Sequence, residues 1–374
     1  MTLRSRRTLL GESGAALGMA VAGSPLFARS VAALDPVAAA RAAVARYAGP
    51  QTSWEGPKSG PKPKSGQYVV YLSGDEQNDI SHEYGVYMAA GAHALGWRFT
   101  VIDGKGSPTS WLAGFNQAIA LKPDGIAIFA DAKSLQGPIS TAVSRNIPVV
   151  GLHAASLPGP QPALKLFVNI EEDPRDIGRA QADWVIAESN GAARVVIVTH
   201  NEYAIAKTKS DATVAAIKSC PGCKVVYYAN FPASEAAQRM PQLTTSWVQT
   251  FGLPLYVTSV GDNDFDFAVP ALRSAGVPTD KVNLVGADGN RSAYARIRAG
   301  LYQTATVSEP IELQAYQAID ELNRALNKAP PSGFVQPPYL VTRANVNQEG
   351  GEKDIFVPNN RYKEHYLRIW GVTA

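Results

Sequence analysis

Short runs of β-branched and apolar residues alternate with longer amphipathic stretches along most of the chain. The first series predicts strands at residues 68–73, 98–103, 125–130 and 148–153, separated by helices over 80–95, 110–121 and 134–145. The second series predicts strands at 193–199, 224–229, 255–260, 282–285 and 303–307, with helices over 174–189, 205–218, 235–250, 267–275 and 292–299. Strands that alternate with helices of this length form βαβ units and parallel sheets.

Two such series predict an α/β fold with two doubly wound, Rossmann-like lobes, each covered by helices on both faces of its sheet. The length of 374 residues suits two lobes of about 150 residues each behind a leader. A short helix is predicted to start at Asp35-Pro36, where an N-cap residue precedes a proline. Residues 49–66 are rich in Pro, Gly, Lys and Ser, which predicts an arm without regular structure.

The charge pattern separates the first 33 residues from the rest. The net charge of +3 is carried entirely by this segment, which has four arginines and one glutamate, so the remainder is neutral. A neutral chain with 45% hydrophobic residues is typical of a globular protein, and it gives no reason to expect a nucleic acid or an anionic membrane surface as a partner.

Residues 1–33 have the features of a removable export signal. Arg6 and Arg7 precede an apolar stretch that ends at Phe27, and small residues follow at Ala28 and at Ala32. The paired arginines resemble signals of the twin-arginine route. A membrane anchor is the alternative, but Glu12 interrupts the run of about 18 apolar residues that an anchor needs. We therefore expect a periplasmic protein with a cleaved signal.

Cys220 and Cys223 flank a Pro-Gly turn between a predicted helix and a predicted strand. A redox centre usually has this motif at the start of a helix that follows a strand, which is the reverse order. In an oxidising compartment we expect a disulfide that closes the turn, with the redox centre as the alternative.

Polar and aromatic side chains follow nearly every predicted strand. Ligands of doubly wound sheets bind at this edge, and scattered donors and acceptors suit a small polar ligand better than a catalytic centre, which needs a coupled nucleophile and base. The candidate ligand-binding residues at this edge are Asp75, Gln77, Asn78, His153, Tyr203, Phe231, Asp262, Asp264, Asp288, Ser308 and Glu309.

The motifs that would indicate an enzyme or a bound ion are incomplete. Gly104-Lys105-Gly106 lacks the third glycine of a dinucleotide-binding turn, because Thr109 occupies that position. The acidic run at residues 262–266 resembles the start of a calcium loop, but Phe267 replaces the required glycine. These carboxylates either cap the next helix or contact a ligand. We expect no cofactor, no metal and no catalytic residues.

Residues 68–346 resemble the type I periplasmic binding proteins of the ribose-binding kind, the substrate receptors of ABC importers. The resemblance rests on the order and spacing of several short motifs rather than on any one of them. They are the strand and polar loop of 68–78, Ala94-Leu95-Gly96-Trp97, the segment 121–126, Asn146-Ile147-Pro148-Val149-Val150, Asn263-Asp264 before 271–276, and Val285-Gly286-Ala287-Asp288-Gly289.

The resemblance implies roles for particular residues. Asn78 matches the amide of the first loop, Phe231 a stacking aromatic residue, and Lys207 a basic residue that reaches the ligand. Residues 262–264 match an Asn-Asp motif, Asp288 an Asp-Gly turn, and Ser308 the last hinge. The chain departs from the family at Ile80-Ser81, where an aromatic pair is usual, and at His153-Ala154, where an Asp-Arg pair is usual.

The family also implies a hinge of three crossings, near Asn169, Ser308 and Pro330. The expected division is an arm over residues 34–65, an N-terminal lobe of 66–168 plus 309–330, and a C-terminal lobe of 169–308 plus 331–374.

The sequence therefore predicts a monomeric receptor that closes on a small neutral sugar or polyol and delivers it to the membrane permease of an ABC importer. The neutral ligand is favoured because the candidate edge carries many carboxylates, which accept hydrogen bonds from hydroxyl groups and repel anions. The alternatives are a sensor subunit for a receptor kinase, a receptor for a small amine or furanone-type signal, and a secreted enzyme on the same fold.

Overall fold

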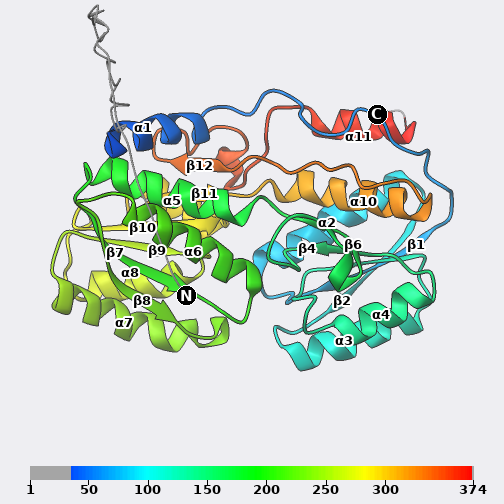
Figure 1. The fold of residues 1–374 in the computed structure, drawn as a ribbon, viewed down its shortest axis with the longest axis horizontal. Helices are drawn as coiled ribbons and strands as arrows, with labels where there is room; N and C mark the ends of the chain where they lie inside the picture. Colours follow the sequence, from blue (N-terminus) through cyan, green and yellow to red (C-terminus); the bar gives the residue numbers. More distant parts are fainter. Residues whose placement is uncertain (1–34, 373–374) are drawn as a thin grey trace, which may run out of the picture. The chain divides into compact units, whose positions relative to one another are not determined.

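The computed structural model describes residues 35–372, so the export signal predicted for residues 1–33 lies outside the described residues. Two six-stranded sheets form the framework of the described chain (Figure 1). The first contains β1 (Tyr68–Ser73), β2 (Arg98–Asp103), β3 (Gly125–Ile128), β4 (Val149–Leu152), β5 (Gly159–Gln161) and β6 (Leu166–Ile170). The second contains β7 (Arg194–Thr199), β8 (Lys224–Asn230), β9 (Leu255–Ser259), β10 (Val282–Asp288), β11 (Gln303–Ser308) and β12 (Tyr339–Thr342).

The first sheet has the strand order β2-β1-β3-β4-β6-β5 and is parallel except for β5. Alternate residues of β1 face opposite sides, as the pleat of a strand requires. Val69 and Tyr71 pack with α2 (Asp79–Ala94) and α10 (Ile311–Leu326), whereas Val70 and Leu72 pack with α3 (Pro108–Ala120) and α4 (Gln136–Ser144). Both faces of this sheet are therefore covered by helices.

The second sheet has the order β12-β11-β10-β9-β7-β8, with only β12 antiparallel. On one face Val195 and Ile197 pack with α1 (Pro36–Tyr47), α5 (Pro174–Glu188) and α6 (Ala204–Lys218). On the other face Val196 and Val198 pack with α7 (Ala236–Phe251) and α8 (Asp264–Ser274). The helix α9 (Arg291–Ala299) packs against β12 through Tyr294. The two doubly wound lobes are as predicted.

The chain passes between the two sheets three times. It leaves the first sheet after β6 and enters α5, whose first turn is capped by Asp173 with Pro174 at the next position. It returns after β11 into α10, and it passes back from α10 to β12. Glu171 and Glu172 therefore lie at the first crossing, and Glu309 lies at the second.

Segments at both ends of the chain also connect the lobes. The helix α1 packs on α5, and the arm that follows reaches the first lobe (Figure 1). There Trp54 stacks on His365, with ring centroids 5.0 Å apart. The sequence places residues 331–374 with the second lobe. In the structure only part of that segment belongs to the second lobe. The strand β12 joins the second sheet, but α11 (Tyr362–Trp370) packs against α10 of the first lobe through Tyr366 and Trp370.

Candidate functional site

A cluster of charged side chains, in which Lys209 and Glu309 are buried and Asp288 is partly exposed, lies where the strand ends of the two lobes meet. His153 follows β4, Asp288 ends β10, and Glu309 follows β11, so all three come from the edge that the sequence singles out. The Lys209 ammonium, from α6, lies 2.9 Å from Asp288 Oδ1 and 3.5 Å from Glu309 Oε1. His153 Nε2 lies 2.5 Å from Glu309 Oε2. We call His153, Lys209, Asp288 and Glu309 the central cluster.

The charges of the central cluster hold Glu309 and Lys209 ionised. Burial alone would raise the pKa of Glu309, but the charges of His153 and Lys209 outweigh burial and bring this pKa down to about 2. Burial alone would lower the pKa of Lys209, but the negative charges of Asp288 and Glu309 raise it instead. Glu309 is therefore a carboxylate and Lys209 an ammonium ion throughout the physiological pH range.

The backbone at two of these positions is unusual. His153 and Asp288 both have positive φ angles, of 52° and 83°, in the left-handed region that residues other than glycine rarely adopt. Both residues stand at the carboxyl end of a strand, one in each lobe.

Aromatic rings lie beside the central cluster on the first lobe. The rings of Tyr84, Phe129 and His153 contact each other, with centroids 5.2 to 6.0 Å apart. The Tyr84 hydroxyl donates to Gln314 Oε1 on α10 and lies 3.3 Å from His153 Nε2. Burial, with Glu309 nearby, raises the pKa of Tyr84 well above its ordinary value, so the hydroxyl stays protonated. Phe129 keeps a partly exposed face that could contact carbon-bound hydrogens of a ligand.

Two further carboxyl groups stand next to the central cluster. Glu171 and Glu172 follow β6, which pairs with β4, and both residues are buried. None of their four carboxyl oxygens has a hydrogen-bond partner within residues 35–372. Burial raises the pKa of both groups well above the usual value of a glutamate, and the charge of Glu309 acts in the same direction. We call Glu171 and Glu172 the open pair.

The two acidic residues at the start of α8 have a different environment. Asp262 accepts hydrogen bonds from Gly289 N at 2.8 Å, Thr306 Oγ1 at 2.7 Å and Gln303 Nε2 at 2.5 Å. Asp264 contacts His200 Nε2 at 3.1 Å and accepts from the Ser259 hydroxyl. We call Asp262 and Asp264 the satisfied pair, because groups of the protein contact both oxygens of Asp262 and Oδ2 of Asp264. The structure thus brings them to the same sheet edge but gives them internal partners.

The backbone at Gly286 passes very close to the Asp262 carboxylate. A Cβ atom at Gly286 would overlap the Asp262 carboxylate, so this close approach requires glycine. Burial raises the pKa of Asp262 to about 7, although the charge of Arg296 and the bond from Thr306 oppose the rise. Burial would lower the pKa of His200, but the bond and charge of Asp264 raise it overall.

The loop after β1 supplies three candidates at the rim of the site. Asp75 Oδ1 accepts from Gln77 N at 2.9 Å, and Asn78 Oδ1 accepts from Ser81 N at 3.0 Å as the N-cap of α2. The Gln77 side chain is exposed. These contacts organise the turn at the start of α2, and they leave the second carboxylate oxygen of Asp75 and the amide nitrogens of Gln77 and Asn78 for other partners.

Three other candidates make contacts within the protein. Tyr203 of the second lobe packs on Trp111 of the first, with ring centroids 5.9 Å apart. Phe231 is buried against His200, and the Ser308 hydroxyl lies 3.1 Å from the Tyr294 hydroxyl.

The lysine that reaches the central cluster is not the one singled out by resemblance. Lys207 is exposed and pairs with Asp211 on the same face of α6, whereas Lys209, two residues later, is buried and binds Asp288. The helical repeat carries a signal for this difference. Ile205, Lys209, Thr213 and Ile217 recur at intervals of four, and all are buried on one face of α6.

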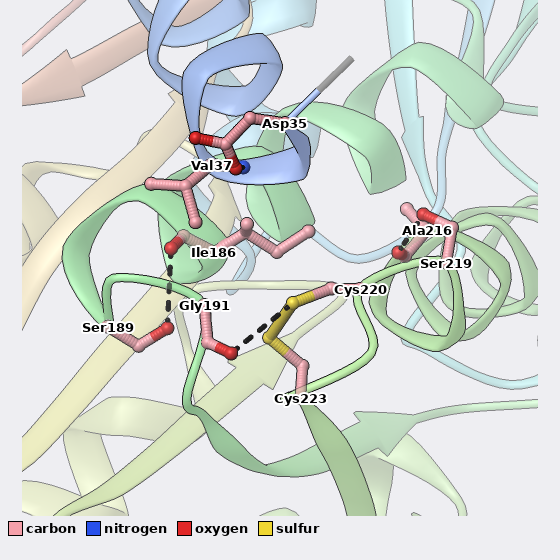
Figure 2. Close-up of a disulfide and its surroundings, with 9 residues drawn as sticks. All are labelled: Asp35, Val37, Ile186, Ser189, Gly191, Ala216, Ser219, Cys220 and Cys223. Carbon is pink, nitrogen blue, oxygen red and sulfur yellow. Dashed lines mark hydrogen bonds between the residues drawn. A yellow bond between two sulfur atoms is a disulfide. The ribbon is translucent and has the colours of Figure 1, made fainter. Parts of the chain in front are cut away.

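Cys220 and Cys223 form a disulfide at the turn between α6 and β8 (Figure 2). Cys220 Sγ lies 3.6 Å from the carbonyl oxygen of Gly191, and Val37 of α1 lies beside this turn in the close-up. Both cysteines belong to the core that α1 and α5 share with the second sheet. The bridge therefore closes a turn in the framework of the second lobe.

The described residues contain neither a metal-binding cluster nor a membrane-spanning helix. Within residues 35–372, no three His, Cys, Asp or Glu side chains are arranged to hold a metal ion. No helix in that range is both long enough and apolar enough to span a membrane.

The sequence matches one protein family over most of its length. The periplasmic binding protein domain family covers residues 69–330. The chain belongs to this family. It is a family of solute-binding proteins rather than of enzymes. No curated protein matches the chain in sequence.

Many solved structures share the fold. The myo-inositol binding protein of Caulobacter, bound to myo-inositol, is 22% identical, with a TM-score of 0.66 over 77% of this chain and 97% of its own. The arabinose transporter's periplasmic binding protein from Shewanella sp. ANA-3, bound to arabinofuranose, is 18% identical, with a TM-score of 0.66 over 80% and 98%. An ABC transporter solute binding protein of Agrobacterium vitis with bound allitol is 19% identical, with a TM-score of 0.67 over 76% and 97%. At these identities, the likeness establishes the fold of two α/β lobes.

Proposed function

We propose that this protein is the periplasmic receptor of an ABC importer and that it captures a small sugar or polyol between its two lobes by hinge closure. The observation that carries the proposal is the central cluster, in which side chains from both lobes and from one crossing meet in a buried position. A group of charges built from two lobes is complete only when the lobes are together, so binding at this group is coupled to closure.

The chemistry of the central cluster suits hydroxyl groups. The carboxylates of Asp288 and Glu309 accept hydrogen bonds, the Lys209 ammonium donates them, and Phe129 offers an aromatic face. Sugars and polyols present alternating hydroxyl groups and carbon-bound hydrogens that fit such a surface. The bound molecules named for the three similar structures, myo-inositol, arabinofuranose and allitol, belong to this chemical class.

The remaining features of the proposal concern location and partners. We propose that residues 1–33 direct export to the periplasm through the twin-arginine route, and that a membrane permease receives the ligand. We propose binding without catalysis, because Glu309 and Lys209 are held ionised by each other and neither is poised to exchange a proton. The rim residues Asp75, Gln77, Asn78 and Tyr203 are proposed as further contacts in the closed state.

Asp288→Asn tests the role of the central cluster. Asparagine tolerates the positive φ angle of this position but removes the charge that faces Lys209. Calorimetric titration with myo-inositol, allitol and L-arabinose should first identify a ligand, and small-angle scattering should show a smaller radius of gyration with that ligand. We expect the variant to bind it at least tenfold more weakly and to melt as a folded protein.

The exposed Asp280, which pairs only with Lys281, provides the matched control. Asp280→Asn should bind like the unmodified protein. Unchanged affinity in Asp288→Asn, or saturation with ligand at a constant radius of gyration, would contradict the proposed site and its closure.

A further inference from the structure

Several buried side-chain atoms of residues 35–372 lack a hydrogen-bond partner, and the open pair differs from the others because both oxygens of each carboxyl group are unpaired. Glu171 and Glu172 are 1% and 0% exposed, and their four carboxyl oxygens lack hydrogen-bond partners within residues 35–372. Buried polar groups are nearly always hydrogen-bonded, since an unpaired one loses its contacts with water and gains nothing. Two adjacent exceptions at the first crossing therefore point to a group that the protein receives from outside.

The neighbouring donors are engaged with other acceptors. The Asn169 amide donates to the Leu157 carbonyl at 3.0 Å and accepts from Ala154 N at 2.9 Å. Lys209 contacts Asp288 and Glu309, and His153 contacts Glu309. Neither Lys209 nor His153 forms a hydrogen bond with the open pair, and the nearby Asn169 amide lowers the pKa of Glu171 only partly against the effect of burial.

Carboxyl groups also outnumber cationic side chains in this part of the molecule. The open pair and the central cluster together contain four carboxyl groups, those of Glu171, Glu172, Asp288 and Glu309. They contain two cationic side chains at most, Lys209 and a protonated His153, and both of these already face Asp288 or Glu309. When the open pair is ionised, no cationic side chain is therefore paired with it, and the charge of Lys209 acts on both groups only from its position beside Asp288 and Glu309.

Protonation of Glu171 and Glu172 does not give their carboxyl groups the missing hydrogen-bond partners. A protonated carboxyl group has an O–H donor that needs an acceptor, and an ionised one has oxygens that need donors. A ligand hydroxyl could donate to an ionised oxygen, but it would leave the buried negative charge unbalanced. A protonated amine supplies up to three donors and a positive charge in one group.

We propose that the ligand of this receptor is a hydroxylated molecule that carries a protonated amine, an amino sugar or amino polyol, and that the ammonium group binds between Glu171 and Glu172. This inference rests on the proposed function and narrows its ligand class. The hydroxyl groups of the same molecule contact Asp288 and Glu309. This positively charged ligand differs from the neutral ligand that the sequence predicts, because the sequence did not reveal the two additional buried carboxyl groups.

Matched pairs of ligands test the proposal. The pairs are D-glucose with D-glucosamine, D-sorbitol with 1-amino-1-deoxy-D-sorbitol, and myo-inositol with scyllo-inosamine, each measured by calorimetric titration at pH 7. We expect the amine of at least one pair to bind tenfold or more tightly than its hydroxyl partner. N-acetylation of that amine, which removes its charge, should abolish the preference.

Variants assign the effect to the open pair. Glu171→Gln and Glu172→Gln keep the size of the side chains, and each should weaken binding of the amine at least tenfold while changing binding of the hydroxyl partner less than threefold. Glu321→Gln is the control, because Glu321 on α10 is also buried but accepts hydrogen bonds from Ser332, which follows that helix. Thermal melts of all variants separate loss of binding from loss of folding.

The outcomes distinguish this inference from the proposed function. If the hydroxyl member of a pair binds and the amine binds no better, the inference is wrong and the receptor function stands. If the amine is preferred but the glutamine variants keep that preference, the open pair is not the subsite. If neither member of any pair binds, both proposals fail.

Discussion

The satisfied pair and the open pair are alike in composition and burial but opposite in their contacts. Asp262 and Asp264 accept hydrogen bonds from backbone, hydroxyl, amide and imidazole groups of the second lobe. Glu171 and Glu172 have no such bonds within the described residues. A buried carboxylate whose oxygens are occupied by the protein joins its elements together, whereas one whose oxygens are unpaired destabilises the fold until a ligand arrives. The number of internal partners therefore separates framework residues from binding residues.

The largest expected effect is the loss of Asp262. Asp262→Ala leaves the donors of Gly289, Gln303 and Thr306 buried without an acceptor, and we expect the free energy of unfolding to fall by about 3 kcal/mol. Chemical denaturation at pH 7 measures this change, with the exposed Asp280→Ala as a control that should leave the transition midpoint in place. A loss below about 0.5 kcal/mol would mean that the satisfied pair is not part of the framework.

A smaller effect of opposite sign is expected in the open pair. Glu172→Met removes a buried carboxyl group without partners and keeps a side chain of similar length. We expect the unliganded protein to gain about 1 to 2 kcal/mol in its free energy of unfolding at pH 7. The same denaturation experiment measures it. Destabilisation by this variant would show that Glu172 has internal contacts, and the contrast between the two pairs would disappear.

The smallest expected effect is a change in the pH dependence of stability. Because the pKa values of Glu171 and Glu172 are higher in the folded protein than the usual 4.5, the folded state holds protons that the unfolded chain releases. Stability of the unliganded protein should therefore decrease as the pH rises above about 4.5. We expect the double variant Glu171→Gln/Glu172→Gln to lose less stability than the unmodified protein between pH 5 and pH 6.

Other titratable groups do not mask the difference in the pH dependence of stability between the double variant and the unmodified protein. Asp262, with a pKa of about 7, also favours the folded state at lower pH, but it is present in both proteins and its contribution cancels. Glu309 has the opposite sign, since its pKa is about 2 and its contribution is lost only as the pH falls through that value. Parallel stability curves for the two proteins would contradict the assignment of raised pKa values to the open pair. The charged groups near the pair are Lys209, Glu309, Asp288, Asp173 and Asp176.

Most of the framework could be predicted from the sequence because its signals are local. The strand predicted at 193–199 is β7 (Arg194–Thr199), and the helix predicted over 205–218 is α6 (Ala204–Lys218). The helix α10 is not among the predicted elements, although its sequence is strongly amphipathic. In the structure it is buried almost all round, including Gln314, Asp320 and Asn323, because α2, α11 and the arm cover it from different sides. Its polar side chains are therefore covered by other parts of the protein rather than by water.

The candidate functional site could be predicted only in part from the sequence. His153, Asp288 and Glu309 follow predicted strands, so their position at the edge could be inferred and the structure brings them together. The strand β6 (Leu166–Ile170) was not predicted, because it is five residues long and follows a Pro-rich segment, and the open pair directly after it was missed. Lys209 was missed because residue type and resemblance favoured its exposed neighbour Lys207.

The sequence by itself determined the order of strands and helices, the two lobes and the edge on which polar loops gather, because periodicity and turn residues act over a few positions. Only the tertiary structure decided which carboxyl groups are satisfied. The partners of Asp262 lie 41 and 44 residues away in Gln303 and Thr306, and Lys209 is 100 residues from Glu309. A hydrogen bond depends on ångström distances between such remote segments, and those distances exist only when both lobes and their crossings have folded together.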